Sequence, residues 1–345
     1  MDGTMKAVAK LEPGHGCELV RVPIPTISRR EVLIKVKAAA ICGTDVHIYE
    51  WDDWAQKRIK TPLIFGHEFC GEIVEAGESV TSVKVGQVVS IETHITCRHC
   101  YYCRQGMGHI CETMKIIGVD RDGCFAEYVS VPDSACWPWE IEVPDEIAAI
   151  QDPYGNAVHT ALSADLVGAD VLITGMGPIG LAAIPVSKLS GAKRVFVTDV
   201  SEYRLELARK LGADVVINPK KEDPVAIIKG MTQGRGADVL LEMSGNPSAI
   251  KQGFSSLRKA GVACILGIPS KPVEFDIAND IVFKSIVVKG INGRRIWDTW
   301  YKGQALLAKG VDLNKLITHK MPLEEIKTGL ELMAAGECGK VILYP

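Results

Sequence analysis

The stretch Val171-Leu-Ile-Thr-Gly-Met-Gly-Pro-Ile-Gly180 joins an apolar segment to a glycine-rich turn. The apolar segment predicts a short buried strand, and the residues from 179 to 190 predict a helix. Between them the turn fits the pattern G-x-G-x-x-G, in the strand-to-helix context that the pattern requires. Gly175 permits the tight turn, Gly177 lets a pyrophosphate approach the backbone, and Gly180 lets the helix pack closely on the strand. Unpaired N–H groups at the helix N-terminus favour phosphates, so this turn predicts a dinucleotide site.

Apolar segments alternate with helical patterns on the C-terminal side of this turn. Further candidate strands lie at residues 195–199, 215–217, 239–242, 263–266 and 285–289. Ser201 is a candidate N-cap for a helix that ends before Gly212. Six apolar strands that alternate with helices predict a parallel sheet covered on both faces. We therefore expect an α/β, doubly wound (Rossmann) domain over residues 155–296.

An acidic residue follows the second candidate strand at the distance typical of dinucleotide sites. Asp199 lies about 20 residues beyond Gly180. Its carboxylate can accept hydrogen bonds from ribose hydroxyls and would repel a 2′-phosphate, which favours NAD over NADP. Arg204, one helical turn further on, leaves some use of NADP open. The alternative is a glycine turn that binds no ligand.

Composition narrows the class of protein. The chain has 345 residues with a formal net charge of −3, which argues against a nucleic-acid-binding protein. The apolar share of 47% is that of a folded domain, and no apolar run approaches the ~18 residues of a membrane span. Residues 1–16 contain no apolar core of the signal-peptide kind. We therefore expect a cytoplasmic protein without a membrane or nucleic-acid partner.

The first part of the chain has a different texture. Residues 31–37 alternate polar and apolar side chains, and residues 66–77 and 83–90 are rich in glycine and β-branched residues. This pattern predicts strands joined by tight turns. Near Asp152 this strand-like pattern of polar and apolar residues ends. The residues after 296 show neither a clear strand pattern nor a clear helix pattern. We expect a mostly-β first domain that ends near residue 154.

Cysteine is the unusual residue of this chain. An odd count of 11 cysteines argues against a disulfide scaffold. Four of them share one short segment, with the spacing Cys97-x2-Cys100-x2-Cys103-x7-Cys111. Four thiolates with two-residue gaps are typical of a closed, tetrahedral structural zinc site. The alternatives are an iron–sulfur cluster, whose usual pattern has a shorter last gap followed by Cys-Pro, and thiols without metal.

A closed zinc site performs no chemistry, so a catalytic site has to lie elsewhere. Cys42, the Gly66-His67-Glu68 turn and Asp152 offer a thiol, an imidazole and carboxylates. Such a set can hold a zinc ion with one position left open for substrate or water. Each residue alone is a weak signal, because a single cysteine in an apolar run is usually a buried small side chain. Their spacing alone does not assemble them.

Taken together and in order, these motifs resemble those of the zinc-dependent medium-chain alcohol dehydrogenases over essentially the full chain. Within that family the chain is similar to the members that oxidise L-threonine. The longer segments that carry this similarity are residues 40–49, 94–97, 152–160 and 202–210. The resemblance implies a GroES-like catalytic domain of residues 1–154 and 297–345, interrupted by the nucleotide domain. It places the structural zinc lobe at about residues 94–113.

The resemblance also assigns site residues. It implies Cys42, His67 and Glu68 as ligands of a catalytic zinc, and Cys97, Cys100, Cys103 and Cys111 as ligands of a structural zinc. Asp152 matches a carboxylate beside the catalytic metal, and whether Glu68 or Asp152 binds the metal at rest stays open. Thr44 and His47 match a proton relay, while His94 matches a histidine linked to recognition of an amino-acid substrate. The implied NAD contacts, beside Gly175, Gly177 and Gly180, are Ile179, Asp199, Arg204, Leu266, Gly267, Ile268, Ile291 and Asn292.

The implied activity is NAD-dependent oxidation of the β-hydroxyl of L-threonine to 2-amino-3-oxobutanoate, with two zinc ions per chain. Residues 285–291 would form an edge strand that pairs across a dimer, and the resemblance implies a homotetramer. One alternative is oxidation of a polyol or vicinal diol by the same machinery. A more distant alternative is a dinucleotide-binding protein without catalysis, which predicts loss of the metal ligands that are present here.

Overall fold

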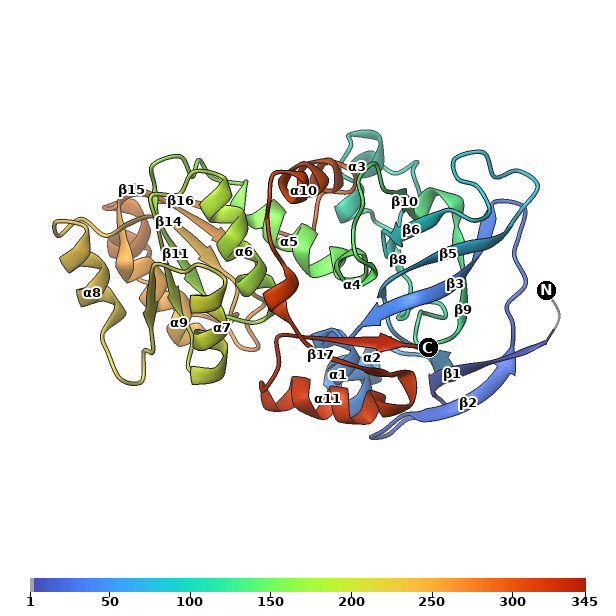
Figure 1. Cartoon of the computed structure of the whole chain (residues 1–345). Coiled ribbons are helices and arrows are strands. Elements are labelled where there is room, and N and C mark those ends of the chain that lie inside the picture. Colours follow the sequence, from blue (N-terminus) through green and yellow to red (C-terminus); the bar gives the residue numbers. More distant parts are fainter. Residues whose placement is uncertain (1–2) are drawn as a thin grey trace. The chain divides into compact units, whose positions relative to one another are not determined.

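The computed structural model describes residues 3–345, so Met1 and Asp2 of the expected first domain lie outside the described residues. The chain divides into two compact units, and the second is inserted into the first. The first unit consists of Met1–Asp152 and Ile317–Pro345, and the second of Pro153–Leu316. In Figure 1 the two ends of the colour scale, blue and red, meet in the first unit, where strand β18 (Lys340–Tyr344) pairs with β3 (Glu31–Ala40).

The second unit extends beyond residue 296, where the sequence suggested that the first domain resumes. Helix α10 (Asp298–Ala308) and the 3-10 turn η4 (Asn314–Leu316) belong to it. The hydroxyl of Tyr154 donates a hydrogen bond of 3.0 Å to the carbonyl of Gly303 in α10. Lys315 in η4 donates to the carbonyl of Lys210 at 2.9 Å. These contacts join the mixed segment after 296 to the nucleotide unit, so the chain returns to the first unit only at Ile317.

The second unit is built on a six-stranded, entirely parallel sheet. Its order is β13-β12-β11-β14-β15-β16. The strands are β11 (Asp170–Thr174), β12 (Arg194–Thr198), β13 (Val215–Ile217), β14 (Ala237–Glu242), β15 (Leu257–Ile265) and β16 (Val287–Gly290). The order reverses between β11 and β14, which confirms the doubly wound α/β fold.

Helices cover both faces of this sheet because its central strands are buried. All five residues of β11 are buried, and its three middle residues are apolar. The covering helices, visible around the sheet in Figure 1, are α6 (Pro178–Leu189), α7 (Glu202–Lys210), α8 (Pro224–Met231) and α9 (Pro247–Ser256). Ser201 caps α7 as predicted, since its hydroxyl accepts the N–H of Arg204 at 3.4 Å. Right-handed crossovers then place α6 and α7 on one face and α9 on the other.

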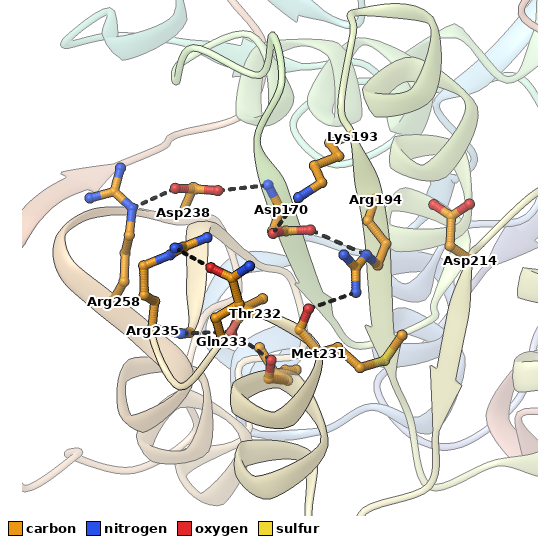
Figure 2. A network of polar contacts seen from close by, with 12 residues as sticks. Asp170, Lys193, Arg194, Asp214, Met231, Thr232, Gln233, Arg235, Asp238 and Arg258 are labelled. Atoms are coloured by element: carbon orange, nitrogen blue, oxygen red, sulfur yellow. Dashed lines mark hydrogen bonds and ion pairs between the residues drawn. The ribbon is translucent and has the colours of Figure 1, made fainter.

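Charged side chains form a network of polar contacts at the amino ends of these strands (Figure 2). Asp170 lies 3.3 Å from Arg194 on the neighbouring strand. Its backbone N–H donates to a carboxylate oxygen of Asp238 at 2.7 Å, and Asp238 also pairs with Arg258. The network therefore links β11, β12, β14 and β15 at their amino ends, away from the glycine turn that follows the carboxyl end of β11.

The first unit is mostly β-structure, as the GroES-like expectation requires. A seven-stranded sheet contains β3, β17 (Ile317–Pro322), β18, β5 (Glu68–Ala76), β6 (Val88–Ile91), β9 (Tyr128–Pro132) and β10 (Cys136–Pro138). A three-stranded sheet contains β1 (Thr4–Lys10), β2 (Glu18–Pro23) and β4 (Leu63–Ile64), and a two-stranded one contains β7 (His94–Ile95) and β8 (Lys115–Ile116).

The first unit also contains short helices and turns. Its α-helices are α1 (Gly43–Glu50), α2 (Asp53–Arg58), α3 (Tyr101–Arg104), α4 (Asp145–Ala149) and α11 (Ile326–Ala335). Helix α5 (Gln151–Ala161) begins in the first unit and continues into the second from Pro153 on. The 3-10 turns are η1 (Gly108–Ile110), η2 (Asp133–Ala135) and η5 (Leu323–Glu325). The second unit adds one π-helical turn, η3 (Ile277–Val282). Within residues 3–345 no helix combines the length and the apolar character needed to cross a membrane.

Eleven free cysteines lie in the described part of the chain, as expected of a protein without a disulfide scaffold. Six of them are outside both candidate metal sites, and all six are buried: Cys17, Cys70, Cys124, Cys136, Cys264 and Cys338. Small apolar side chains often fill such positions. A packing role therefore explains these six thiols.

Candidate active site

Cys42, His67 and Glu68 form a compact set of metal-ligand donors in the first unit. Their donor atoms all lie within 4.8 Å of one another. Cys42 follows β3, and Glu68 begins β5, where Ala40 and Glu68 are partners in the antiparallel ladder. This pairing brings together two turns that are separate in the sequence. The set therefore depends on strand register and not on the spacing of its residues.

A buried carboxylate, Asp45, connects two members of this set. The backbone N–H of Cys42 donates to one oxygen of Asp45 at 2.8 Å, which caps the start of α1. The other oxygen lies 3.5 Å from Nδ1 of His67. Carboxylates commonly orient metal-binding imidazoles in this way. Sequence reasoning missed Asp45, although its place three residues after the cap is a recognisable signal.

Electrostatics at His67 favour a positive charge at this position. Burial opposes the charge, but Asp45 and Cys42 outweigh it and hold the pKa of His67 well above its ordinary value. A ring that is surrounded by anionic groups is suited to sit beside a cation.

Lys340 is a second functional candidate that sequence reasoning missed. Its ammonium is fully buried, donates to the carbonyl of Ile41 at 2.8 Å and pairs with one carboxylate oxygen of Glu68. Burial raises the pKa of Glu68 to about 7, Lys340 opposes the shift, and the charge of Asp152 adds to it. The other oxygen of Glu68 is buried and has no hydrogen-bond partner among the described residues.

Asp152 lies at the start of α5 and outside the compact set. Its charge nevertheless acts on Glu68. Of the two carboxylates that the sequence left open as ligands, the structure groups Glu68 with Cys42 and His67. Asp152 is a neighbouring carboxylate, and its negative charge disfavours the ionised form of Glu68.

Thr44 and His47, the residues expected to relay a proton, lie one turn apart on α1. The hydroxyl of Thr44 is 3.9 Å from the sulfur of Cys42, so it borders the metal-ligand set. His47 is exposed, and its Nδ1 lies 2.7 Å from a carboxylate oxygen of Asp52. Asp52 also caps α2 through the N–H groups of Trp54 and Ala55. The two helices thus hold His47 at the solvent side of the site.

His94 forms a similar pair with Glu92. One carboxylate oxygen of Glu92 accepts the backbone N–H of His94 at 3.0 Å and lies 2.8 Å from Nδ1 of its ring. Glu92 is buried, whereas the His94 side chain is about one fifth exposed, at 21%. A carboxylate on Nδ1 fixes the tautomer and the orientation of an imidazole. His94 therefore presents Nε2 away from Glu92.

The four-cysteine segment folds into a lobe between β7 and β8. The sulfurs of Cys97, Cys100, Cys103 and Cys111 all lie within 4.8 Å of one another. Backbone N–H groups point at two of them, with Cys97 N–H 3.3 Å from Cys111 and Cys100 N–H 3.3 Å from Cys97. The N–H of His99 contributes most to lowering the pKa of Cys97 to about 6. These N–H groups favour the thiolate of Cys97, the form that binds zinc, whereas burial raises the pKa of Cys103 to about 12.

In the second unit the three glycines of the turn meet three different requirements. Gly175 has φ of +86°, and a Cβ there would lie 2.7 Å from Cα of Ser244. A Cβ on Gly180 would lie 1.9 Å from the carbonyl oxygen of Gly175. A Cβ on Gly177, in contrast, would meet open space. The first and third glycines serve the fold, and the open side of Gly177 is where a phosphate can approach.

Asp199 holds this turn in place. One carboxylate oxygen accepts the N–H of Met176 at 2.6 Å, and the other accepts the N–H of Ser201 at 2.8 Å. Each oxygen keeps a further lone pair for a ribose hydroxyl. Arg204 is half-buried one turn on, and its Nε has no hydrogen-bond partner among the described residues.

The other expected NAD contacts follow the carboxyl ends of two neighbouring strands. Leu266, Gly267 and Ile268 follow β15, while Ile291 and Asn292 follow β16. In a parallel sheet the carboxyl ends of all strands lie on the same side, so these residues lie on the side where the glycine turn follows β11. The side chain of Ile268 is 91% exposed, so it is free to contact a ligand. Ile179 lies half-buried in the first turn of α6.

Known proteins match the chain over its full length. Residues 28–144 match the alcohol dehydrogenase GroES-like domain, and residues 178–309 match the zinc-binding dehydrogenase domain. The chain is 55% identical over 347 residues to the L-threonine 3-dehydrogenase of Caldanaerobacter subterraneus subsp. tengcongensis, an alignment that covers 100% of both chains. The chain belongs to the family of zinc-binding alcohol dehydrogenases. It is therefore an oxidoreductase, as the sequence predicted.

Solved structures of zinc-binding alcohol dehydrogenases and their kin share this fold. A short chain alcohol dehydrogenase from Escherichia coli CFT073, complexed with NADH, is 31% identical over 99% of both chains with a TM-score of 0.90. The 2R,3R-butanediol dehydrogenase of Bacillus subtilis is 32% identical over 99% of both chains with a TM-score of 0.89. The expected cofactors, zinc and a nicotinamide dinucleotide, are confirmed for the family.

The residues of this alcohol dehydrogenase fit those groups. Sulfur, imidazole nitrogen and carboxylate oxygen are the donors that zinc prefers, and the unpartnered oxygen of Glu68 lies beside the other two. Cys42, His67 and Glu68 would hold one zinc ion, and the four cysteines of the lobe would hold a second. The open side of Gly177 and the carboxylate of Asp199 suit the phosphates and ribose of a dinucleotide.

Proposed function

We propose that the chain catalyses NAD-dependent oxidation of L-threonine at its β-hydroxyl to 2-amino-3-oxobutanoate, a step in threonine catabolism toward glycine. The observation that carries this proposal is the compact set of Cys42, His67 and Glu68 with its unpartnered, buried carboxylate oxygen. Full-length identity to an L-threonine 3-dehydrogenase supports the substrate. We assign the alcohol site to the first unit and NAD binding to the second.

When bound, zinc supplies a Lewis acid that lowers the pKa of an alcohol, and NAD supplies the hydride acceptor. In this proposal Thr44, which borders Cys42, takes the hydroxyl proton of the substrate. His47 then passes that proton to solvent, because its ring is exposed and an imidazole can both accept and donate a proton. Asp52 orients the ring of His47 through the contact at Nδ1.

The pair of Glu92 and His94 supports an amino-acid substrate. Glu92 holds Nδ1 of His94, so Nε2 is left to meet a polar group of the substrate. We propose that this group is the carboxylate or the ammonium of threonine, which polyols and diols do not have.

A panel of substrates tests the proposed function. We expect kcat/KM with NAD to be at least about tenfold higher for L-threonine than for sorbitol or 2R,3R-butanediol, because only threonine carries charges for His94 to recognise. We also expect kcat/KM for L-threonine to be higher with NAD than with NADP, because the carboxylate of Asp199 would repel a 2′-phosphate. Formation of NADH, with the zinc content of the same sample, is the measurement.

Two outcomes would contradict this function. Faster oxidation of a diol than of threonine would favour the polyol alternative. One zinc ion per chain and no turnover of any alcohol would favour a binding protein without catalysis. Two zinc ions per chain are expected for the enzyme.

We further infer a homotetramer that acts in the cytoplasm. All four residues of the edge strand β16 are exposed, including Val287 at 50% and Val288 at 46%. An exposed, apolar edge strand favours pairing with the same strand of a second copy. The free thiols support a reducing compartment.

Substitution at the strand edge tests the assembly. We expect native mass spectrometry to find four copies of the wild-type chain. Val288→Lys places a charge on the edge and should shift the mass to smaller species. Val85→Lys, another exposed valine at 61%, is the matched control and should leave the mass unchanged. A monomeric wild type would contradict the inference.

A further inference from the structure

Glu242 is a buried carboxylate at the point where the strand order of the second unit reverses. It ends β14, and in the parallel ladder it is the partner of Thr174 at the end of β11. Its side chain is fully buried. Oε1 accepts the N–H of Ser244 at 2.9 Å, the N–H of Gly245 at 3.2 Å and the hydroxyl of Thr174 at 3.3 Å. The hydroxyl of Ser244 also donates to it.

All the donors that the structure gives to Glu242 are neutral groups of the surrounding turns. Buried carboxylates are costly unless hydrogen bonds satisfy them, and bonds to a charged acceptor are about twice as strong as neutral ones. A charged acceptor below a loop therefore fixes that loop more firmly than a neutral side chain would. The loop in question is the connection from β14 to α9, residues 243–246.

The loop after β15 and the glycine turn after β11 both pack against the loop of residues 243–246, so closely that their glycines leave no room for a Cβ. Gly245 has φ of +63°, and a Cβ on it would lie 2.5 Å from the carbonyl oxygen of Ile268. A Cβ on Gly267 would lie 2.2 Å from the nitrogen of Gly245 and 2.5 Å from Oε2 of Glu242. The glycine turn also touches this loop, because Gly175 leaves no room for a Cβ against Ser244. Glu242 is thus the shared support of the loops that follow β11, β14 and β15.

We propose that Glu242 is the positioning residue for the nicotinamide half of the dinucleotide cradle. A doubly wound sheet binds one mononucleotide on each side of the reversal in strand order. Asp199 and the glycine turn serve the first half, and the loops held by Glu242 form the second. Glu242 acts through these loops and does not touch the cofactor. This inference rests on the NAD site proposed above.

Binding of two probes to Glu242→Gln tests the proposal. Glutamine can keep an acceptor at the position of Oε1, but it removes the negative charge and replaces the other oxygen, which accepts the N–H of Gly245 at 3.3 Å, by an NH₂ donor. We expect the Kd for NADH, measured by fluorescence on the full chain, to rise about tenfold. The Kd for AMP, which needs only the adenosine half, should change less than about twofold. Ser244→Ala, a milder change, should raise the Kd for NADH about threefold and spare AMP binding.

Asp238→Asn is the matched control, because Asp238 is a carboxylate on the same strand at the opposite end. It accepts the N–H of Asp170 and pairs with Arg258 (Figure 2). We expect it to lower the unfolding temperature and to leave both Kd values unchanged. Equal losses of NADH affinity in both carboxylate variants, or parallel losses for AMP and NADH in Glu242→Gln, would overturn the proposal. If the wild type bound neither probe, the NAD site itself would be wrong.

Discussion

Replacing Cys42 by serine is expected to lower kcat/KM for threonine oxidation by about 10³-fold or more, because the compact donor set loses its thiolate. The fold should survive the change. Cys42 is the N-cap of α1, where Asp45 accepts its backbone N–H at 2.8 Å, and serine is among the preferred N-cap residues. Zinc content should fall from two ions to one per chain, with the unfolding temperature changed little. Steady-state kinetics and metal analysis on one preparation measure both effects.

Cys100→Ser gives the complementary result and serves as the control. It removes one sulfur of the lobe, which lies in a different segment of the first unit. This variant should also lose one zinc ion, but here the unfolding temperature falls and the folded enzyme keeps most of its activity. Full turnover by Cys42→Ser would show that the assigned catalytic set is not the alcohol site.

The second large effect is expected at Lys340. Methionine at this position is unbranched and only one atom shorter than lysine, but it leaves the buried carboxylate of Glu68 without the ammonium of Lys340. Removing one partner of a buried ion pair costs about 3–5 kcal/mol, so the free energy of unfolding should fall by that amount. Urea denaturation of the full chain measures it. Adding Glu68→Gln to the same chain should restore at least about half of the loss, because the carboxylate that Lys340 neutralised is then absent.

Lys10→Met is the matched control for Lys340→Met. Lys10 is also buried, but its ammonium meets the carbonyl oxygens of Gly14, Gly16 and Tyr49 and no carboxylate. Its loss leaves only neutral acceptors, which costs about 1–3 kcal/mol. An equal or smaller effect at Lys340 than at Lys10 would contradict the buried ion pair. So would the absence of any recovery in the double variant.

The features that the sequence predicted best are those encoded within short segments. The strand, turn and helix around Gly175–Gly180 follow one another directly, so their pattern and their geometry coincide. The four cysteines of the lobe lie within one segment that two short strands close. The boundary at residue 296 differed from the structural one because nothing in the local pattern shows that Gly303 meets the hydroxyl of Tyr154.

The supporting residues were hidden because their partners are distant or their patterns ordinary. Asp45 has the appearance of a helix cap, and only the turn beside β5 gives it His67 as a neighbour. Glu242 has the appearance of the last residue of a strand, and only the loops after β11 and β15 make it a shared support. Glu92 orients the ring of His94, two residues away, and a strand pattern alone does not show that these two side chains meet.

Local periodicity and close spacing are enough to predict the fold class, the dinucleotide turn and the four-cysteine lobe. The assembly of the donor set of Cys42, His67 and Glu68, in contrast, follows from tertiary contacts. Pairing of β3 with β5 brings Cys42 to His67 and Glu68, and pairing of β18 with β3 delivers Lys340 from the far end of the chain. Strand register fixes these contacts, and register depends on the packing of the whole unit, which no single segment encodes.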